Sequence, residues 1–229
     1  MMITSRASAA SSSASWAACR SIHRIAFASC YVYSPSGTSA ASRRSRLLRA
    51  LLKAGDAGFI FKYAVRVRQQ VDDASPLAGF LCHSQVLVPI PGSAPAVAGT
   101  RSVAEHLACA LVAVGLGHSI WSGLHRSFAV RKSATAVPGS RPTVGTHYDS
   151  FAVDMDTAPP PQIVLIDDVV TKGRTLLAAA ARLQDAFPET EIRAFALLRT
   201  MGFVDGVEHL LDPCVGEIRW RAGDALRSP

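Results

Sequence analysis

Short apolar runs alternate along the chain with segments of helical periodicity, and this alternation predicts an α/β fold. The runs at 86–91, 163–166 and 192–198 consist mainly of apolar residues, which is typical of parallel strands buried on both faces. Between the runs, apolar residues spaced by three or four predict helices at 102–114 and 176–187. Strand and helix in this order favour a parallel sheet with right-handed crossovers.

Weaker patterns predict the remaining elements. A helix is expected at 42–54, with Ser42 as its N-cap and Gly55 as its end. The segment 59–71 is apolar and basic in turn, and it fits either a helix or a strand. Brief strands are expected at 120–124 and 151–153.

The first 41 residues differ in composition from the rest of the chain. They are rich in Ser and Ala, and no Asp or Glu precedes Asp56. Such a segment buries little apolar surface, so residues 1–41 are predicted to be a disordered leader. An inert tail, an early start codon and an organelle transit peptide remain open as explanations. The predicted organisation continues with a helical hood segment at 42–80 and one α/β domain at 81–229.

The net charge of +7 belongs to the N-terminal part of the chain. Eight of the 24 basic residues precede Asp56, which leaves 16 basic residues against 17 acidic ones in the remainder. Nucleic-acid binding through the folded domain is therefore not expected. No apolar run reaches the roughly 18 residues of a membrane span. Five scattered cysteines favour free thiols in a reducing compartment, which is taken as the cytoplasm.

Two adjacent carboxylates follow the run at 163–166. Asp167 and Asp168 would be costly to bury without partners, so their position at the end of an apolar strand predicts a crevice that holds a polar ligand. The loop 171–175 comes next and carries hydroxyls, a glycine and two cations. Because it precedes a helix, its backbone N–H groups suit a phosphate. The unit therefore predicts a sugar-phosphate site.

The stretch 163–176 resembles the motif that binds phosphoribosyl diphosphate (PRPP) in type I phosphoribosyltransferases. In that family two acids hold the ribose hydroxyls, which would make Asp167 and Asp168 the catalytic pair, and the following loop wraps the 5-phosphate. Two positions depart from the motif, because Lys172 replaces a usual Thr and Arg174 a usual small residue. The residues expected to bind the ribose and 5-phosphate are Asp167, Asp168, Val169, Val170, Thr171, Lys172, Gly173, Arg174 and Thr175.

The resemblance also implies where the donor's pyrophosphate binds. A loop of small residues after 86–91 would hold it through Gly92 and Ser93, with Arg101 as a charge partner. The polar and basic segment 126–147 stands where the family has a flexible lid. Arg131 and Lys132 are its candidate pyrophosphate ligands.

Within the family, the chain looks most like the competence-protein-F branch, although the zinc-binding cysteines of that branch are missing. The implied reaction displaces pyrophosphate from C1 of PRPP with a nitrogen nucleophile of unknown identity. Mg²⁺ would be bound mainly through PRPP, with no direct protein ligand predicted. A homodimer is compatible with the resemblance. One alternative is a non-catalytic protein on the same fold, either a PRPP or nucleotide sensor or a competence-type accessory protein. Another alternative is a diverged relative with an idle site.

Overall fold

A mostly parallel sheet forms the centre of the molecule. The structure is a computed structural model that describes residues 16, 22–71, 75–97, 99–131, 141–155, 160–202, 204 and 206–229. Within these residues the main sheet has seven strands in the order β3-β2-β6-β7-β1-β8-β9, of which β3 to β1 are parallel and β8 and β9 antiparallel. The strands are β1 (Arg24–Tyr33), β2 (Val86–Pro89), β3 (Ser119–Ile120), β6 (Gln162–Val170), β7 (Glu191–Thr200), β8 (Leu211–Arg221) and β9 (Asp224–Ser228).

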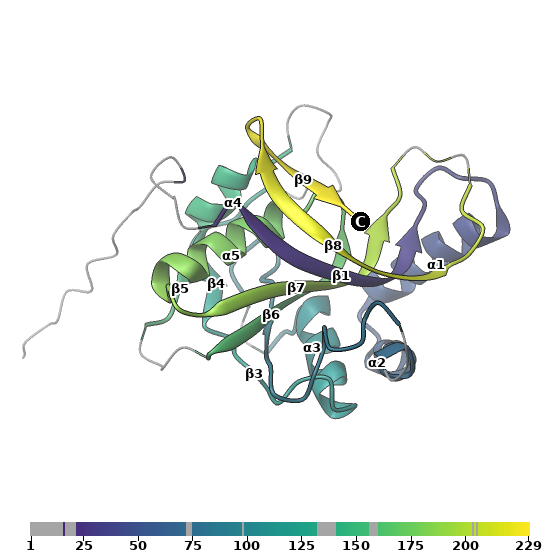
Figure 1. The fold of residues 1–229 in the computed structure, drawn as a ribbon, viewed down its shortest axis with the longest axis horizontal. Helices are drawn as coiled ribbons and strands as arrows, with labels where there is room; N and C mark the ends of the chain where they lie inside the picture. Colours follow the sequence, from purple (N-terminus) through teal and green to yellow (C-terminus); the bar gives the residue numbers. More distant parts are fainter. Residues whose placement is uncertain are drawn as a thin grey trace, which may run out of the picture.

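Helices cover both faces of this sheet (Figure 1). Leucines and alanines of three helices pack on one face: α1 (Ala40–Ala54), α2 (Ala57–Val71) and α3 (Val103–Ala113). The other face carries α4 (Val144–Ser150), α5 (Arg174–Ala186) and a small antiparallel pair, β4 (Leu124–Arg126) with β5 (Phe151–Val153). The predicted α/β architecture, a parallel sheet flanked by helices, is confirmed.

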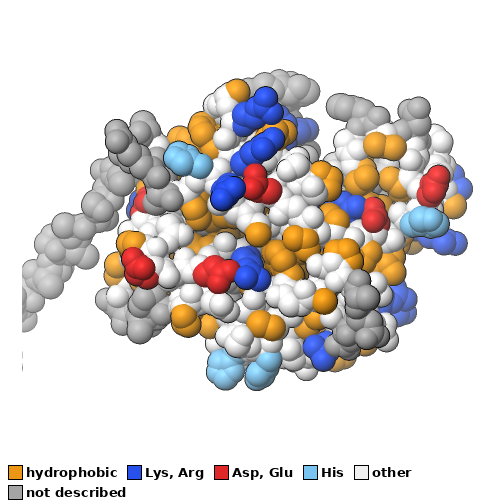
Figure 2. Space-filling model, viewed as in Figure 1, with side chains coloured by type: hydrophobic (Ala, Val, Ile, Leu, Met, Phe, Trp, Pro, Cys, Tyr) orange, Lys and Arg blue, Asp and Glu red, His pale blue; other side chains and the backbone are white. Residues whose placement is uncertain are grey.

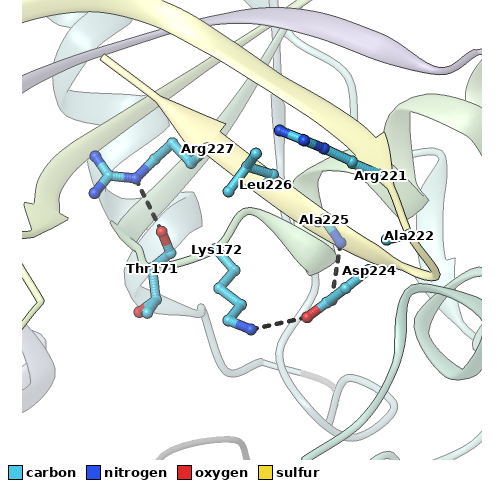
Figure 3. Close-up of a pocket in the computed structure, with 8 residues that line it drawn as sticks. All are labelled: Thr171, Lys172, Arg221, Ala222, Asp224, Ala225, Leu226 and Arg227. Atoms are coloured by element: carbon cyan, nitrogen blue, oxygen red, sulfur yellow. Dashed lines mark hydrogen bonds and ion pairs between the residues drawn. The ribbon is translucent and has the colours of Figure 1, made fainter.

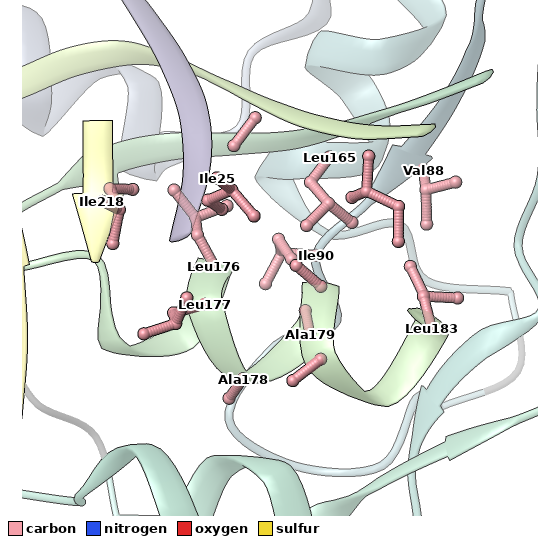
Figure 4. Close-up of a cluster of buried hydrophobic side chains, with 14 of the residues drawn as sticks. Ile25, Val88, Ile90, Leu165, Leu176, Leu177, Ala178, Ala179, Leu183 and Ile218 are labelled. Atoms are coloured by element: carbon pink, nitrogen blue, oxygen red, sulfur yellow. The ribbon is translucent and has the colours of Figure 1, made fainter. Parts of the chain in front are cut away.

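The helix α5 lies close to the sheet because its inner face is built from small side chains. The four residues Ala178–Ala181 are fully buried, and Leu176 and Leu177 beside them fill the space under β8 (Figure 4). Burying each leucine contributes about 2 kcal/mol. This packing fixes the start of α5, and with it the loop that joins β6 to α5.

The strand β1 corrects the prediction of a disordered leader at 1–41. Its ten residues lie between β7 and β8, and Phe27, Ala28 and Cys30 are fully buried. The expectation relied on a low local content of large apolar residues. The strand itself carries the buried residues Ile25, Phe27, Tyr31 and Val32, a local apolar run that the average composition of residues 1–41 conceals. Residues 1–15 and 17–21 lie outside the described residues.

Other boundaries differ in detail from the expectations. The helix α1 begins at Ala40 with Ser39 as its N-cap, so Ser42 is not the cap, and it ends at Gly55 as predicted. The undecided segment 59–71 belongs to a helix, α2. The strand expected at 120–124 is instead divided between β3 and β4, which belong to different sheets.

The chain reverses its direction across the sheet between β2 and β6. From β2 it moves outward to β3, and the next parallel strand, β6, lies on the other side of β2. The helices that follow these two strands, α3 and α5, cover opposite faces. Loops that leave neighbouring parallel strands toward opposite faces open a crevice at the carboxyl edge, which is where ligands bind in open α/β sheets. By this rule the place for a ligand is the carboxyl edge between the loops after β2 and β6, which is called the crevice below.

No described helix combines the length and the apolar character that crossing a bilayer requires.

Candidate functional site

The strand β6 carries the two aspartates to the carboxyl edge of the sheet. It continues past the pair to Val170, which corrects the expectation that the strand ends in the two carboxylates. The Oδ1 atom of Asp167 accepts a hydrogen bond from the backbone N–H of Asp168 at 2.8 Å. Asp167 is partly buried, and Asp168 is only 6% exposed. Two acids with so little water around them need nearby positive charge.

Lys53, in the last turn of α1, supplies part of that charge. Its Nζ lies 2.6 Å from Oδ2 of Asp168, while the lysine side chain itself remains half exposed. In the sequence, Lys53 is the next-to-last residue of the helix expected at 42–54. Its partner lies more than a hundred residues later, so no local pattern indicates the contact.

The two carboxylates share one region of low polarity, and this changes the protonation of Asp167. Burial, followed by the negative charge of Asp168, raises the pKa of Asp167 well above its usual range. Lys53 acts in the opposite direction but does not cancel the effect. The raised pKa of Asp167 favours a proton on this carboxyl, which would let the edge both donate and accept hydrogen bonds with ligand hydroxyls.

The loop after β6 leaves the first turn of α5 without a side-chain cap. Gly173 precedes the helix with φ 85°, a left-handed conformation that favours glycine, and no side chain hydrogen-bonds the first turn. Uncapped amides at a helix start bind anions. The same glycine is covered by β8, since a Cβ atom built on it would lie 2.6 Å from Cγ2 of Ile218.

Both cations of this loop are held by the hairpin of β8 and β9. Arg174 makes a two-pronged contact with Asp224, at 2.5 Å from Nε and 2.7 Å from Nη2, and Lys172 Nζ lies 2.9 Å from the same carboxylate. The hydrogen bonds from Arg174 and Lys172 hold the pKa of Asp224 well below its usual range. Arg174 also donates to the carbonyl of Pro142 at 3.1 Å. Its side chain therefore extends toward the hairpin.

A cavity of about 330 Å³ lies between the loop and the hairpin (Figure 3). Arg227 borders it and donates from Nε to the carbonyl of Thr171 at 2.9 Å. Further basic side chains, Arg219 and Arg221, are exposed on the hairpin, where basic groups gather in Figure 2. The aspartates of β6 do not line this cavity. Its lining residues are Thr171, Lys172, Arg221, Ala222, Asp224, Ala225, Leu226 and Arg227.

Arg126 and His147, the two ends of the lid predicted at 126–147, are buried, while residues 132–140 of that segment lie outside the described residues. Arg126 donates from Nε to the carbonyl of Gly92 at 3.0 Å, and its Nη2 lies 3.2 Å from Nδ1 of His147. Burial lowers the pKa of Arg126 to about 10, so it stays cationic at neutral pH. Burial and the nearby charges of Arg126 and Arg174 lower the pKa of His147 to about 4.

A neutral His147 connects this group to the loop 171–175. With Nδ1 accepting from Arg126, the ring proton resides on Nε2, which lies 3.4 Å from Oγ1 of Thr175. The hydroxyl of Thr175 can then accept from the histidine and still donate to a ligand. Polar and basic composition alone suggested a solvated lid, and only the fold shows that Arg126 and His147 support the site from inside.

The loop after β2 faces the same crevice. The carbonyls of Gly92 and Ser93 accept from Arg126 and from the backbone N–H of Val130, at 3.0 and 2.6 Å. In a trans peptide bond the N–H group lies on the side opposite the C=O group. The backbone N–H groups of Ser93 and Ala94 therefore point away from Arg126 and Val130, the donors to the two carbonyls.

The other predicted pyrophosphate ligands are Arg101, Arg131 and Lys132, and Arg131 directly follows Val130, which donates to Ser93. Arg101 is exposed, and its Nη1 lies 3.9 Å from Sγ of Cys109. Arg131 is exposed at the end of a described segment, and Lys132 lies outside the described residues.

The acid pair does not fit a directly bound divalent metal ion. Lys53 already lies against Asp168, and the raised pKa of Asp167 disfavours the ionised form that a metal ligand requires. Among the residues that the structure describes, no three His, Cys, Asp or Glu side chains form a group that could hold a metal ion.

Neither a protein-family model nor a curated protein sequence matches this chain.

Proposed function

We propose that this protein binds PRPP at the crevice between β2 and β6 and acts as a phosphoribosyltransferase. The observation that carries the proposal is the single strand-loop-helix unit that combines the acid pair of β6 with the uncapped start of α5. Acidic groups that accept hydroxyls lie before the loop, and amides that bind phosphate lie after it. A phosphorylated pentose carries both groups at matching ends.

The 5-phosphate would be held by the first turn of α5 and by two threonines. Thr171 Oγ1 lies 3.1 Å from Oγ1 of Thr200, and Thr175 Oγ1 lies 3.4 Å from Nε2 of His147. Each hydroxyl has further hydrogen-bonding capacity after these contacts. Together with the amides of the helix start, they would surround an anion with donors.

The ring would be held by Asp167 and Asp168, and the diphosphate would lie toward the amides after Gly92 and Ser93. In the reaction the bond from C1 to the diphosphate oxygen breaks, and its electron pair leaves with pyrophosphate. A nitrogen of the acceptor forms the new bond to C1 and loses its proton to solvent. Residues of this chain would contribute by orienting the donor and by excluding water. Mg²⁺ enters only as the counter-ion of the donor's diphosphate.

Calorimetric titration with PRPP and Mg²⁺ tests the binding. The wild type should bind, and Asp167→Asn combined with Asp168→Asn should abolish binding. Asp154→Asn is the matched control, because Asp154 is an exposed acid whose contact is His125 at 3.6 Å. Release of pyrophosphate with a panel of nitrogen bases then tests catalysis. A wild-type protein that is folded but binds no PRPP would refute the proposal and favour a diverged relative with an idle site.

A non-catalytic PRPP or nucleotide sensor is the second candidate, and the hairpin favours it. Asp224 holds both cations of the phosphate loop, and Ile218 lies against Gly173. A ligand that displaces Asp224 would release the hairpin, which is how a sensor would report occupancy. Binding of PRPP without pyrophosphate release for every acceptor tested would support the sensor.

A further inference from the structure

The ion pair between Lys53 and Asp168 connects an N-terminal helix to the acid pair at the centre of the candidate site. The two partners differ in their surroundings, since the Asp168 side chain is 9% exposed and the Lys53 side chain 50% exposed. Asp168 is therefore fixed in the strand, while the lysine reaches it from the solvent side. Lysine has a flexible stem and a compact charge that can move between anionic partners.

A pentose hydroxyl cannot replace the charge of Lys53. When the ring hydroxyls of a donor bind Asp168, they supply hydrogen bonds but no positive charge. The aspartate would lose part of its contact with the ammonium of Lys53. The flexible, half-exposed Lys53 side chain would then be available to another anion nearby.

In PRPP that anion is attached to the next carbon of the ring. The diphosphate is on C1, beside the hydroxyl on C2. If Asp168 binds that hydroxyl, the Lys53 side chain in contact with Asp168 lies next to the diphosphate. Ribose 5-phosphate carries no anion at this position. The two sugars share the hydroxyls and the 5-phosphate, and they differ in charge only at the side of the ring that bears the diphosphate.

We infer that Lys53 is a specificity-determining residue that exchanges Asp168 for the diphosphate of the donor, and so selects PRPP over ribose 5-phosphate. This inference rests on the proposed function. It assigns to α1 a direct contact with the ligand, in addition to its packing on β1. Gly55, with φ 76°, caps the C-terminus of α1. Its cap fixes the end of the last helical turn, which carries Lys53.

Calorimetry with both ligands tests the inference. Lys53→Met should lower the affinity for PRPP by about tenfold or more, the loss typical of one charge-assisted contact. Its affinity for ribose 5-phosphate should stay the same or rise. Lys53→Arg should retain most of the preference for PRPP. Lys62→Met is the matched control, since Lys62 is exposed on α2, and it should change neither affinity.

The possible failures are distinguishable. A loss of equal size for both ligands, or no loss for either, would overturn the role of Lys53 while leaving PRPP binding intact. A folded wild type that binds neither ligand would overturn the proposed function and this inference together. If Lys53→Met does not fold by circular dichroism, Lys53→Gln keeps a side chain of similar reach without the charge and is subject to the same criteria.

Discussion

Replacing Gly173 with alanine tests how the hairpin covers the phosphate loop. The added methyl group acts in two ways. Alanine at φ 85° costs about 1–2 kcal/mol, because its Cβ crowds the backbone in the left-handed region. The same Cβ would lie 2.6 to 2.8 Å from three side-chain carbons of Ile218, and forcing such a contact in a packed interior costs about 1–3 kcal/mol more.

A second glycine separates the two costs. Gly223 has φ 84°, almost the same as Gly173, and a Cβ atom built on it meets no atom within 4 Å. Gly223→Ala should therefore lose only the backbone contribution, about 1–2 kcal/mol. Gly173→Ala should lose about 2–5 kcal/mol in total. Urea unfolding followed by circular dichroism measures both losses.

A double-mutant cycle with Ile218→Ala isolates the contact. The three Ile218 carbons nearest to the new methyl group all lie beyond Cβ, so Ile218→Ala removes them. Ile218 is fully buried, so the single change should cost about 2–5 kcal/mol. In that background Gly173→Ala should cost no more than Gly223→Ala does in the wild type. If Gly173→Ala and Gly223→Ala are equally destabilising in the wild type, the hairpin does not press on the loop and the reasoning fails.

Three further predictions follow from ionisable groups. His147 has a folded pKa of about 4 against about 6.5 unfolded, so the unfolded state binds more protons between these values and stability falls as the pH falls. Between pH 7 and pH 5 the wild type should lose about 2 kcal/mol more than His147→Gln in urea unfolding, and equal losses would contradict the pKa. Asp224→Asn frees two cations and should tighten phosphate binding by about two- to fivefold in calorimetry, whereas Glu217→Gln on the same hairpin should not. Burial raises the pKa of Cys30 to about 12, so iodoacetamide should modify the partly exposed Cys82 first, and early labelling of Cys30 would contradict its burial.

The sequence predicts the elements whose signals are local. The strand at 163–166, the helix that follows it and the capped helix after Ser102 are each defined by neighbouring residues, and all three are present. The Ser102 cap is completed by Glu105, three residues further on, in a reciprocal capping box.

The missed features depend on partners far away in the chain. β1 lies between β7 and β8, whose residues come late in the chain, and its short apolar run stands in a leader otherwise rich in Ser and Ala. Lys53 and Asp224 reach the site from opposite ends of the sequence. Arg126 and His147 stand at the ends of a segment whose polar and basic composition is typical of a loop. They are buried because β4 and α4 belong to the same core cluster as α5. Composition gives the number of charged residues in a segment, but it does not tell whether their side chains point into the core or into the solvent.

The position of β1 between two late strands has a consequence for synthesis on the ribosome. Side-chain contacts of Ser29 join it to Arg199, 170 residues later, and to Cys214, 185 residues later. At about 5–20 residues per second, the emerging N-terminal strand would wait roughly 10–40 s for its neighbours. During that delay an unpaired β-strand is exposed to other nascent chains. We therefore expect the yield of native protein to depend on chaperones that bind the chain during translation.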